Sequence, residues 1–129
     1  MSSYVLDASA LLTLLKNEAG GEQVAAILEE EAVMSSVNLS EVVAKLSAKG
    51  IPEELIRKLL SGLKIMIVDF DTRFAYEAGL LLPLTRHVGL SLGDRACLVL
   101  AKHLNLPAVT ADRVWGNLSL DVTIRVIRG

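Results

Sequence analysis

Short apolar segments alternate with helical stretches along most of the chain, and this alternation limits the folds it can adopt. The apolar segments are the candidate strands, at 4–6, 32–35, 65–68, 107–110 and 122–127. Most successive candidate strands are separated by helical stretches, so their connections are crossovers. Crossovers of this kind are right-handed and place the strands side by side in parallel. The sequence therefore predicts a single α/β domain in which helices flank a mostly parallel sheet.

The helical stretches carry start and stop signals of their own. We expect helices at 8–17, 22–31, 39–49, 52–63, 71–84 and 92–104, and a short turn or helix around 112–115. Asn38 is the expected N-cap of the third helix, and Ser91 is the expected cap of the last long one. Asp71 has the same position before the fifth helix. We interpret Asp71 as a cap and leave it, with Asp69, out of any candidate site.

The composition restricts the functions that such a domain can have. The 129 residues correspond to one domain, 1–129, and a hydrophobic fraction of 52% is enough for a core. The formal net charge at pH 7 is −2, so a globally basic nucleic-acid footprint is absent. A polyanionic partner would therefore have to be held by a local patch or through a bound cation.

Two features indicate where the protein works. Cys97 is the single cysteine, so neither an intramolecular disulfide nor a thiol cluster can form. A reduced, cytoplasmic setting fits this best. Asp7 interrupts the first apolar run, and no segment approaches the roughly 18 apolar residues of a membrane span. We expect a soluble intracellular protein with no membrane contact.

Four carboxylates stand where strands end or helices begin. Asp7 follows the first candidate strand, and Asp112 follows the fourth. Glu41 and Asp94 lie in the first turns of expected helices. In a parallel sheet these positions share one edge, which is where ligands of open α/β sheets bind. We therefore expect four acids that are distant in sequence to converge in one cleft.

Each acid also has a purely structural explanation. The segment 91–94 matches a capping box, and 38–41 is closely related to one. Asp7 could cap the first helix, and Asp112 could form an Asx turn. Caps alone, however, do not require four carboxylates to point into one cleft.

A carboxylate cluster calls for a cation, because each negative charge raises the pKa of its neighbours. Mg²⁺ or Mn²⁺ suits a site of few carboxylates that keeps waters for a phosphate substrate. His87 and His103 are isolated, so a zinc site is not indicated. The chemistry favoured is metal-assisted hydrolysis of a phosphodiester.

Four spaced segments carry a family resemblance. Residues 5–12, 38–43, 92–101 and 109–112, in this order, resemble the PIN-domain nucleases and in particular the VapC-type toxins of toxin–antitoxin pairs. The resemblance covers nearly the whole chain. It implies a five-stranded parallel sheet, an endoribonuclease that depends on Mg²⁺ or Mn²⁺, a homodimer, and inhibition by a small antitoxin protein.

The resemblance also assigns roles to residues. The catalytic and metal-binding acids would be Asp7, Glu41, Asp94 and Asp112. The first three would be the ligands, direct or through water, whereas the role of Asp112 varies within such sites. Ser9 and Thr110 would supply supporting hydroxyls, and Asn38 would orient the loop before Glu41.

The cations admit two interpretations. Arg95 is either a solvated or ion-paired charge or a candidate contact for the RNA phosphate. Five cations are either a solvated helical face or a patch for the RNA backbone, and they are Lys45, Lys49, Arg57, Lys58 and Lys64.

Two leucine-rich runs, 11–15 and 80–84, are more apolar than one buried stripe requires. Each run either packs in the core or forms a groove for a partner's apolar helix.

Two other functions remain open at this point. A PIN domain can be a non-catalytic RNA-binding or scaffold module, because metal geometry is not visible in a sequence. A phosphoacceptor receiver domain would use Asp69 as acceptor and Thr110 as switch residue. Such a domain also needs an acidic pair after the first strand and a lysine after the last, whereas Asp7 has no acidic neighbour and Arg128 stands at the end.

Overall fold

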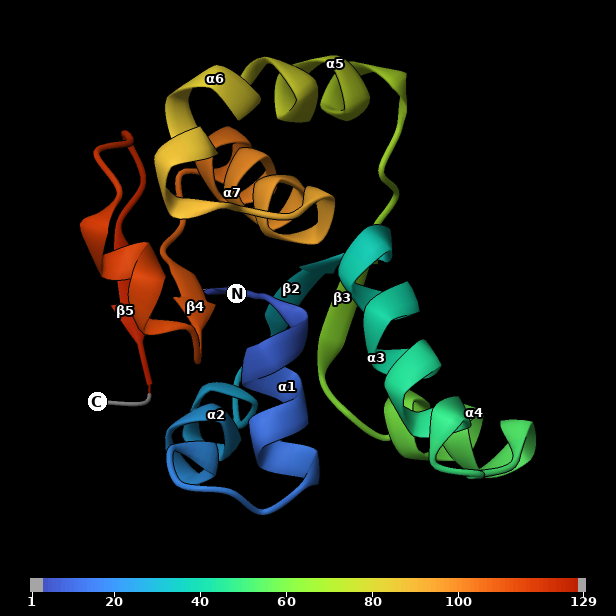
Figure 1. Cartoon of the computed structure of the whole chain (residues 1–129). Coiled ribbons are helices and arrows are strands. Elements are labelled where there is room, and N and C mark those ends of the chain that lie inside the picture. The colour runs from blue at the N-terminus through green and yellow to red at the C-terminus, as the bar shows by residue number, and fades with distance from the viewer. Residues whose placement is uncertain (1–3, 128–129) are drawn as a thin grey trace.

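Five strands form one sheet in the computed structural model, which describes residues 4–127 (Figure 1). All pairs are parallel, in the order β3-β2-β1-β4-β5. The strands are β1 (Val5–Leu6), β2 (Ala32–Ser35), β3 (Ile65–Val68), β4 (Ala108–Thr110) and β5 (Ile124–Val126). This confirms the predicted α/β fold with a parallel sheet of five strands. Arg128, used above against the receiver domain, lies outside the described residues.

The helices connect the strands largely as expected. They are α1 (Ala8–Leu15), α2 (Gly21–Ile27), α3 (Ser36–Ala48), α4 (Glu53–Ser61), α5 (Thr72–Leu80), α6 (Leu82–Thr85) and α7 (Leu92–Leu104), with 3₁₀ turns η1 (Arg86–Val88) and η2 (Arg113–Asn117). The expected helix 71–84 is split into α5 and α6 near Leu81. The expected start of α3 is wrong. Its N-cap is Ser35, whose Oγ accepts from Val37 N at 3.2 Å, so Asn38 lies inside the first turn.

The strands place alternate side chains on the two faces of the sheet. Val5, Val33 and Ala108 belong to the core formed with α5 and α7. Leu6, Met34 and Val109 belong to the core formed with α1, α2, α3 and α4. Helices thus cover both faces, and this burial on both sides explains why β1, β2 and β4 are continuous apolar runs.

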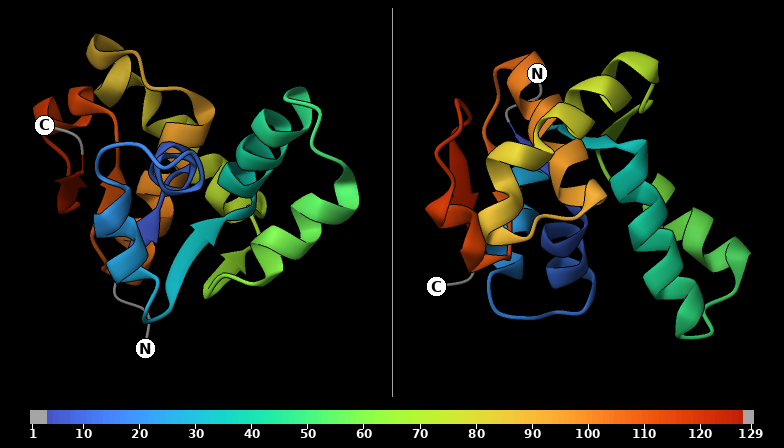
Figure 2. Two further views of the ribbon diagram at one scale, coloured as in Figure 1. Left: turned by 90° about the horizontal axis from the view of Figure 1, so that it is seen from below. Right: turned by 45° about the horizontal axis from the view of Figure 1, so that its top comes forward.

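The two edges of the sheet and the hairpin of α3 and α4 are more exposed. Met66 and Ile67 of β3 are exposed because β3 lies at one edge. Figure 2 shows α3 and α4 extending together away from the rest of the domain.

Across residues 4–127, no helix combines the length and apolar character needed to cross a membrane.

The parallel arrangement determines where functional side chains can meet. β1 ends immediately before Asp7, and β4 ends shortly before Asp112. The backbone keeps these two ends together, since Asp7 N donates to Val109 O at 3.0 Å. α3 starts directly after β2, and α7 packs against β1 and β2. The first turns of both helices therefore lie at the same edge of the sheet.

Candidate active site

All four predicted acids line one cavity of about 200 Å³ at this edge. The cavity is lined by Asp7, Ala8, Ser9, Leu12, Glu41, Lys45, Asp94 and Asp112. The structure thus brings together side chains from four separate segments. It also adds Lys45, which the sequence did not place among the acids.

Asp7 is the buried acid of the cavity, with only 3% of its surface exposed. Its Oδ1 accepts from Ala10 N and Ser9 Oγ, both at 2.8 Å, so it caps α1 as the structural explanation proposed. Its Oδ2 accepts from Thr110 Oγ1 at 2.6 Å and from Ser9 Oγ at 2.9 Å. The cap and the cavity position are therefore properties of the same carboxylate.

Burial raises the pKa of Asp7 from 3.8 to about 6, because a charged carboxylate is poorly solvated there. The negative charge of Asp94 contributes in the same direction. The hydrogen bonds from Thr110, Ala10 and Ser9 lower the pKa of Asp7 and offset part of the rise. A pKa this far above normal in a cleft is typical of functional carboxylates, although structural networks also produce it.

Two hydroxyls connect the ends of β1 and β4. Ser9 Oγ lies 3.3 Å from Thr110 Oγ1 and accepts from Ala111 N at 3.0 Å. Thr110 Oγ1 accepts from Asp112 N at 3.0 Å. Both hydroxyls therefore contact Asp7, and both accept from backbone amides just after β4. Asp112 itself is exposed and caps η2 through its Oδ1.

Glu41 is held from the other side of the cavity by Asn38 and Gly93. Asn38 is 1% exposed, and its Nδ2 donates to Glu41 Oε1 at 2.8 Å and to Gly93 O at 3.0 Å. Asn38 thus orients the carboxylate itself, not a loop before it. Its buried Oδ1 has no hydrogen-bond partner among the described residues.

Gly93 is a site residue that the sequence reasoning missed. A Cβ at this position would overlap the Glu41 carboxylate, so only glycine lets that group lie against the first turn of α7. A signal was present, because glycine is a poor residue in a helix and Gly93 stands inside one. Its partner Glu41, however, lies far away in sequence.

Asp94 closes the cavity from α7. It forms a capping box with Ser91, in which Ser91 N donates to Asp94 Oδ2 at 2.9 Å and Asp94 N donates to Ser91 Oγ at 3.2 Å. One turn later lies the buried thiol of Cys97. Burial raises the pKa of this thiol, and the charges of Asp7, Asp94 and Glu41 raise it further. The charges of three of the acids therefore all raise the pKa of the same buried thiol.

Two of the five candidate cations are engaged outside the cavity. Arg57 pairs with Glu53 at 2.7 Å, and Lys64 Nζ donates to Glu29 O at 3.1 Å. Lys45 alone among the five candidate cations lines the cavity. The alternative of a single patch formed by all five is therefore not supported.

Arg95 is directed away from the acids. Its Nη1 donates to Ala78 O at 2.9 Å near the end of α5, and its buried Nε has no hydrogen-bond partner within the described chain. Arg95 is not among the residues that line the cavity. The geometry therefore gives no support to a substrate contact by Arg95.

The donor set of the cavity fits a hard divalent cation, since all four candidate ligands are carboxylates. In residues 4–127, however, no three side chains of the ligating types are grouped closely enough to hold a metal ion. The four carboxylates line the cavity without forming such a group. Neither histidine joins them, and His103 instead packs edge-on against Phe74 with ring centroids 5.3 Å apart.

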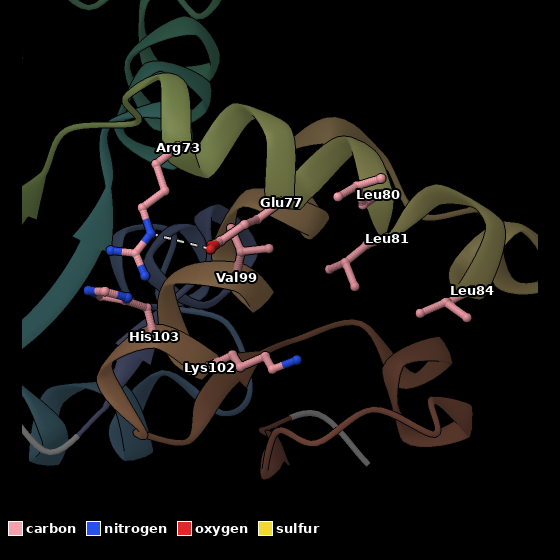
Figure 3. A pocket seen from close by; sticks show the side chains of 8 residues that line it. All are labelled: Arg73, Glu77, Leu80, Leu81, Leu84, Val99, Lys102 and His103. Atoms are coloured by element: carbon pink, nitrogen blue, oxygen red, sulfur yellow. Dashed lines mark hydrogen bonds and ion pairs between the residues drawn. The ribbon is translucent and has the colours of Figure 1, made fainter.

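A second, apolar cavity of about 440 Å³ lies between α5, α6 and α7 (Figure 3). Leu80 and Leu84 line it and are 72% and 60% exposed. Arg73 and Glu77 form an ion pair at 3.4 Å on its rim. The run 80–84 is thus largely a surface feature, whereas Leu11 and Leu12 are buried in the core.

One family model matches most of the chain, and several solved structures share its fold. A family model described as "PIN domain" matches residues 4–119. No curated protein matches the chain. A toxin–antitoxin complex from Klebsiella pneumoniae is similar in structure, with a TM-score of 0.75, 17% identity and coverage of 97% of this chain and 98% of that one.

Two further solved structures have the same fold. The DNA-bound VapBC from Salmonella typhimurium has a TM-score of 0.74 and 18% identity, and covers 98% of this chain and 99% of its own. VapBC-1 from nontypeable Haemophilus influenzae has a TM-score of 0.69 and 21% identity, with coverage of 96% and 97%.

The receiver-domain alternative is overturned by the family match and by the site. The hydroxyl of Thr110 donates to Asp7 and accepts from Asp112 N, so it is engaged within the acidic cavity. Asp69, the supposed phosphoacceptor, is exposed beyond β3 and does not line that cavity.

Proposed function

Because the chain belongs to the PIN domain family, we propose that it is a metal-dependent endoribonuclease and the toxin of a toxin–antitoxin pair. PIN domains are generally nucleases. The observation that supports the proposal most strongly is that four carboxylates from distant segments line one cavity. Their donor chemistry suits Mg²⁺ or Mn²⁺, and such a cation would let an acidic protein hold a phosphodiester.

The residues of the cavity have distinct roles in this proposal. Asp7, Glu41 and Asp94 would hold the Mg²⁺ or Mn²⁺ ion, and Asp112 would complete the acidic set. Held by these residues, such a cation would polarise the phosphate, lower the pKa of the attacking water and stabilise the leaving oxygen.

The supporting side chains set the orientation of the acids before any ligand binds. Ser9 and Thr110 donate to both oxygens of Asp7, which limits its rotation. Asn38 does the same for one oxygen of Glu41. In the metal-free protein, burial and the charge of Asp94 favour a proton on Asp7 up to about pH 6. At neutral pH this carboxylate is mainly charged, so it can serve as a ligand.

The proposed partners are an RNA substrate, a small antitoxin and a second copy of the chain. Two similar structures are described as VapBC, and a third as a toxin–antitoxin complex. A partner needs apolar surface, and Tyr76, Leu80 and Leu84 are exposed on α5 and α6.

Cleavage of RNA by the purified protein tests the activity. We expect cleavage with Mg²⁺ or Mn²⁺, none with a chelator, and at least about a 100-fold loss in Asp94→Asn. Asp69→Asn is the control, because Asp69 is an acid that lies outside the cavity, and the change removes the same charge. Full activity of Asp94→Asn, or activity that survives the chelator, would contradict the proposal.

A non-catalytic RNA-binding PIN domain is the second candidate, because no closed metal site is formed in residues 4–127. Thermal unfolding separates the two functions. A cation that binds only the folded acids raises the melting temperature through linkage. Absence of any shift at millimolar Mg²⁺ or Mn²⁺, together with retained RNA binding, would favour the second candidate.

A further inference from the structure

Lys45 is the one cation among the residues that line the acidic cavity. It lies on α3 one helical turn after Glu41 and is exposed. Within the described part of the chain, its ammonium group forms neither a hydrogen bond nor an ion pair. A cation that stands beside four carboxylates and pairs with none of them calls for an explanation.

The spacing of Glu41 and Lys45 normally favours an ion pair. A glutamate four residues before a lysine or arginine is the favourable orientation on a helix. Glu53 and Arg57 form such a pair on α4 at 2.7 Å. Glu41 and Lys45 have the same spacing and order, and yet they do not pair.

The reason lies in the partners of Glu41. Its carboxylate is drawn toward α7, where Asn38 Nδ2 donates to Oε1 at 2.8 Å and Gly93 leaves the space it occupies. This arrangement keeps Glu41 away from Lys45 and leaves the ammonium group free at the cavity wall. Asn38 and Gly93 thus determine the state of Lys45 as well as that of Glu41.

The charge balance of the cavity indicates a function for the free ammonium group of Lys45. A bound divalent cation would neutralise only half of the four carboxylate charges, so the wall would still repel a phosphodiester. Among the other four candidate cations, Arg57 and Lys64 are engaged elsewhere, and Lys49 and Lys58 do not line the cavity. Lys45 is therefore placed to attract a phosphate to this cavity. A lysine suits that task, as a compact charge on a flexible stem.

We infer that Lys45 binds a backbone phosphate of RNA at the acidic cavity, so that it is a substrate-contacting residue of this site. The inference rests on the proposed function in that it takes RNA as the substrate. It differs from the expectation of a basic patch, because one lysine acts here and not a face of five cations.

RNA binding by Lys45→Gln tests the inference. Fluorescence anisotropy of a short labelled single-stranded RNA would be measured with Mg²⁺ and with a chelator, and a gel would verify that the RNA is intact. Lys16→Gln is the matched control, since it removes the same charge from an exposed lysine at the far end of α1. We expect Lys45→Gln to weaken binding about tenfold and Lys16→Gln to leave it unchanged.

The salt dependence and a conservative variant sharpen the test. Loss of one phosphate contact to single-stranded RNA reduces the slope of log K against log salt by about 0.7. Lys45→Arg keeps the charge, so it should restore most of the binding. Thermal unfolding of all variants should match the wild type, because Lys45 is exposed and unpaired.

The outcomes separate this inference from the proposed function. RNA cleavage with equal binding by Lys45→Gln and Lys16→Gln overturns the inference and keeps the nuclease. RNA binding that depends on Lys45 in a protein without cleavage activity supports the inference and contradicts the nuclease. A protein that neither binds nor cleaves RNA contradicts both.

Discussion

The two sides of the acidic cavity hold their carboxylates in different ways. On the side of β1 and β4, Asp7 is 3% exposed and receives hydrogen bonds from two hydroxyls and a backbone amide. On the side of α3 and α7, Glu41 is only partly buried and receives one amide donor, while Gly93 provides its space. On the first side, burial of the charged Asp7 carboxylate lowers the stability of the folded protein. On the second side, the position of the Glu41 carboxylate depends on the space that Gly93 leaves.

This difference predicts that variants on the two sides of the cavity lose different properties. A change beside Asp7 should alter stability and its pH dependence. A change beside Glu41 should alter activity at nearly constant stability. The three variants below test this contrast in order of decreasing expected effect.

Asp7→Asn should change the pH dependence of stability most. The pKa of Asp7 is about 6 in the folded protein against 3.8 as its ordinary value, so the folded state binds the proton more tightly. In metal-free buffer, the unfolding free energy contributed by Asp7 should therefore fall as pH rises from about 4 to about 6, and stay low above that. The total change is at most about 3 kcal/mol.

Urea unfolding at a series of pH values in a chelator measures this effect. Asp7→Asn should lack this part of the pH dependence and should gain stability relative to the wild type above pH 6. Asp71→Asn is the control, because Asp71 also caps a helix but is exposed. If the unfolding free energy depends on pH in the same way for the wild type and Asp7→Asn, the buried charge of Asp7 does not lower stability.

Gly93→Ala should impair activity with little loss of stability. The added Cβ displaces the Glu41 carboxylate, and misplacement of a catalytic group by about 1 Å can cost on the order of 100-fold. The carboxylate is the end of a flexible side chain, so the fold can accommodate the shift, and alanine favours a helix.

RNA cleavage and thermal unfolding, measured together, check this variant. Gly79→Ala is matched to it, because Gly79 also lies inside a helix but has open space at its Cβ position. We expect Gly79→Ala to keep full activity. A Gly93→Ala protein that cleaves RNA as fast as Gly79→Ala would refute the role given to Gly93.

Thr110→Val should have the smallest effect of the three. It removes the hydroxyl that donates to Asp7 Oδ2 and that holds Asp112 N, at nearly constant volume. Because that hydrogen bond lowers the pKa of Asp7, its loss should raise the pKa further and cost about 1 kcal/mol or somewhat more above pH 6. Urea unfolding at pH 8 measures the loss, and a smaller loss is expected at pH 4.

The sequence predicted the fold well where local pattern decides structure. β2 and β3 begin and end as expected, and Ser91 caps α7. The predicted start of α3 was wrong because α3 follows β2 without a loop, so both Ser35 and Asn38 were possible N-caps. Ser35 is the N-cap in the structure, and the side-chain amide of Asn38 donates a hydrogen bond to Glu41.

The candidate site was predictable in its acids and not in their surroundings. Carboxylates at strand ends are visible in a sequence once the sheet is known to be parallel. The contact of Gly93 with Glu41 is not, since it joins residues on two different helices. The unpaired state of Lys45 follows from that same contact, and the direction of Arg95 toward Ala78 depends on how α5 packs on α7.

The proposed function requires that the acids of this cavity form one site for a divalent cation. Diffraction from crystals soaked in Mn²⁺, recorded at a wavelength where manganese scatters anomalously, tests it most directly. We expect an anomalous peak in contact with Asp7, Glu41 and Asp94, directly or through water, and its loss in Asp94→Asn. Peaks only at other acids, or none at saturating Mn²⁺, would contradict it.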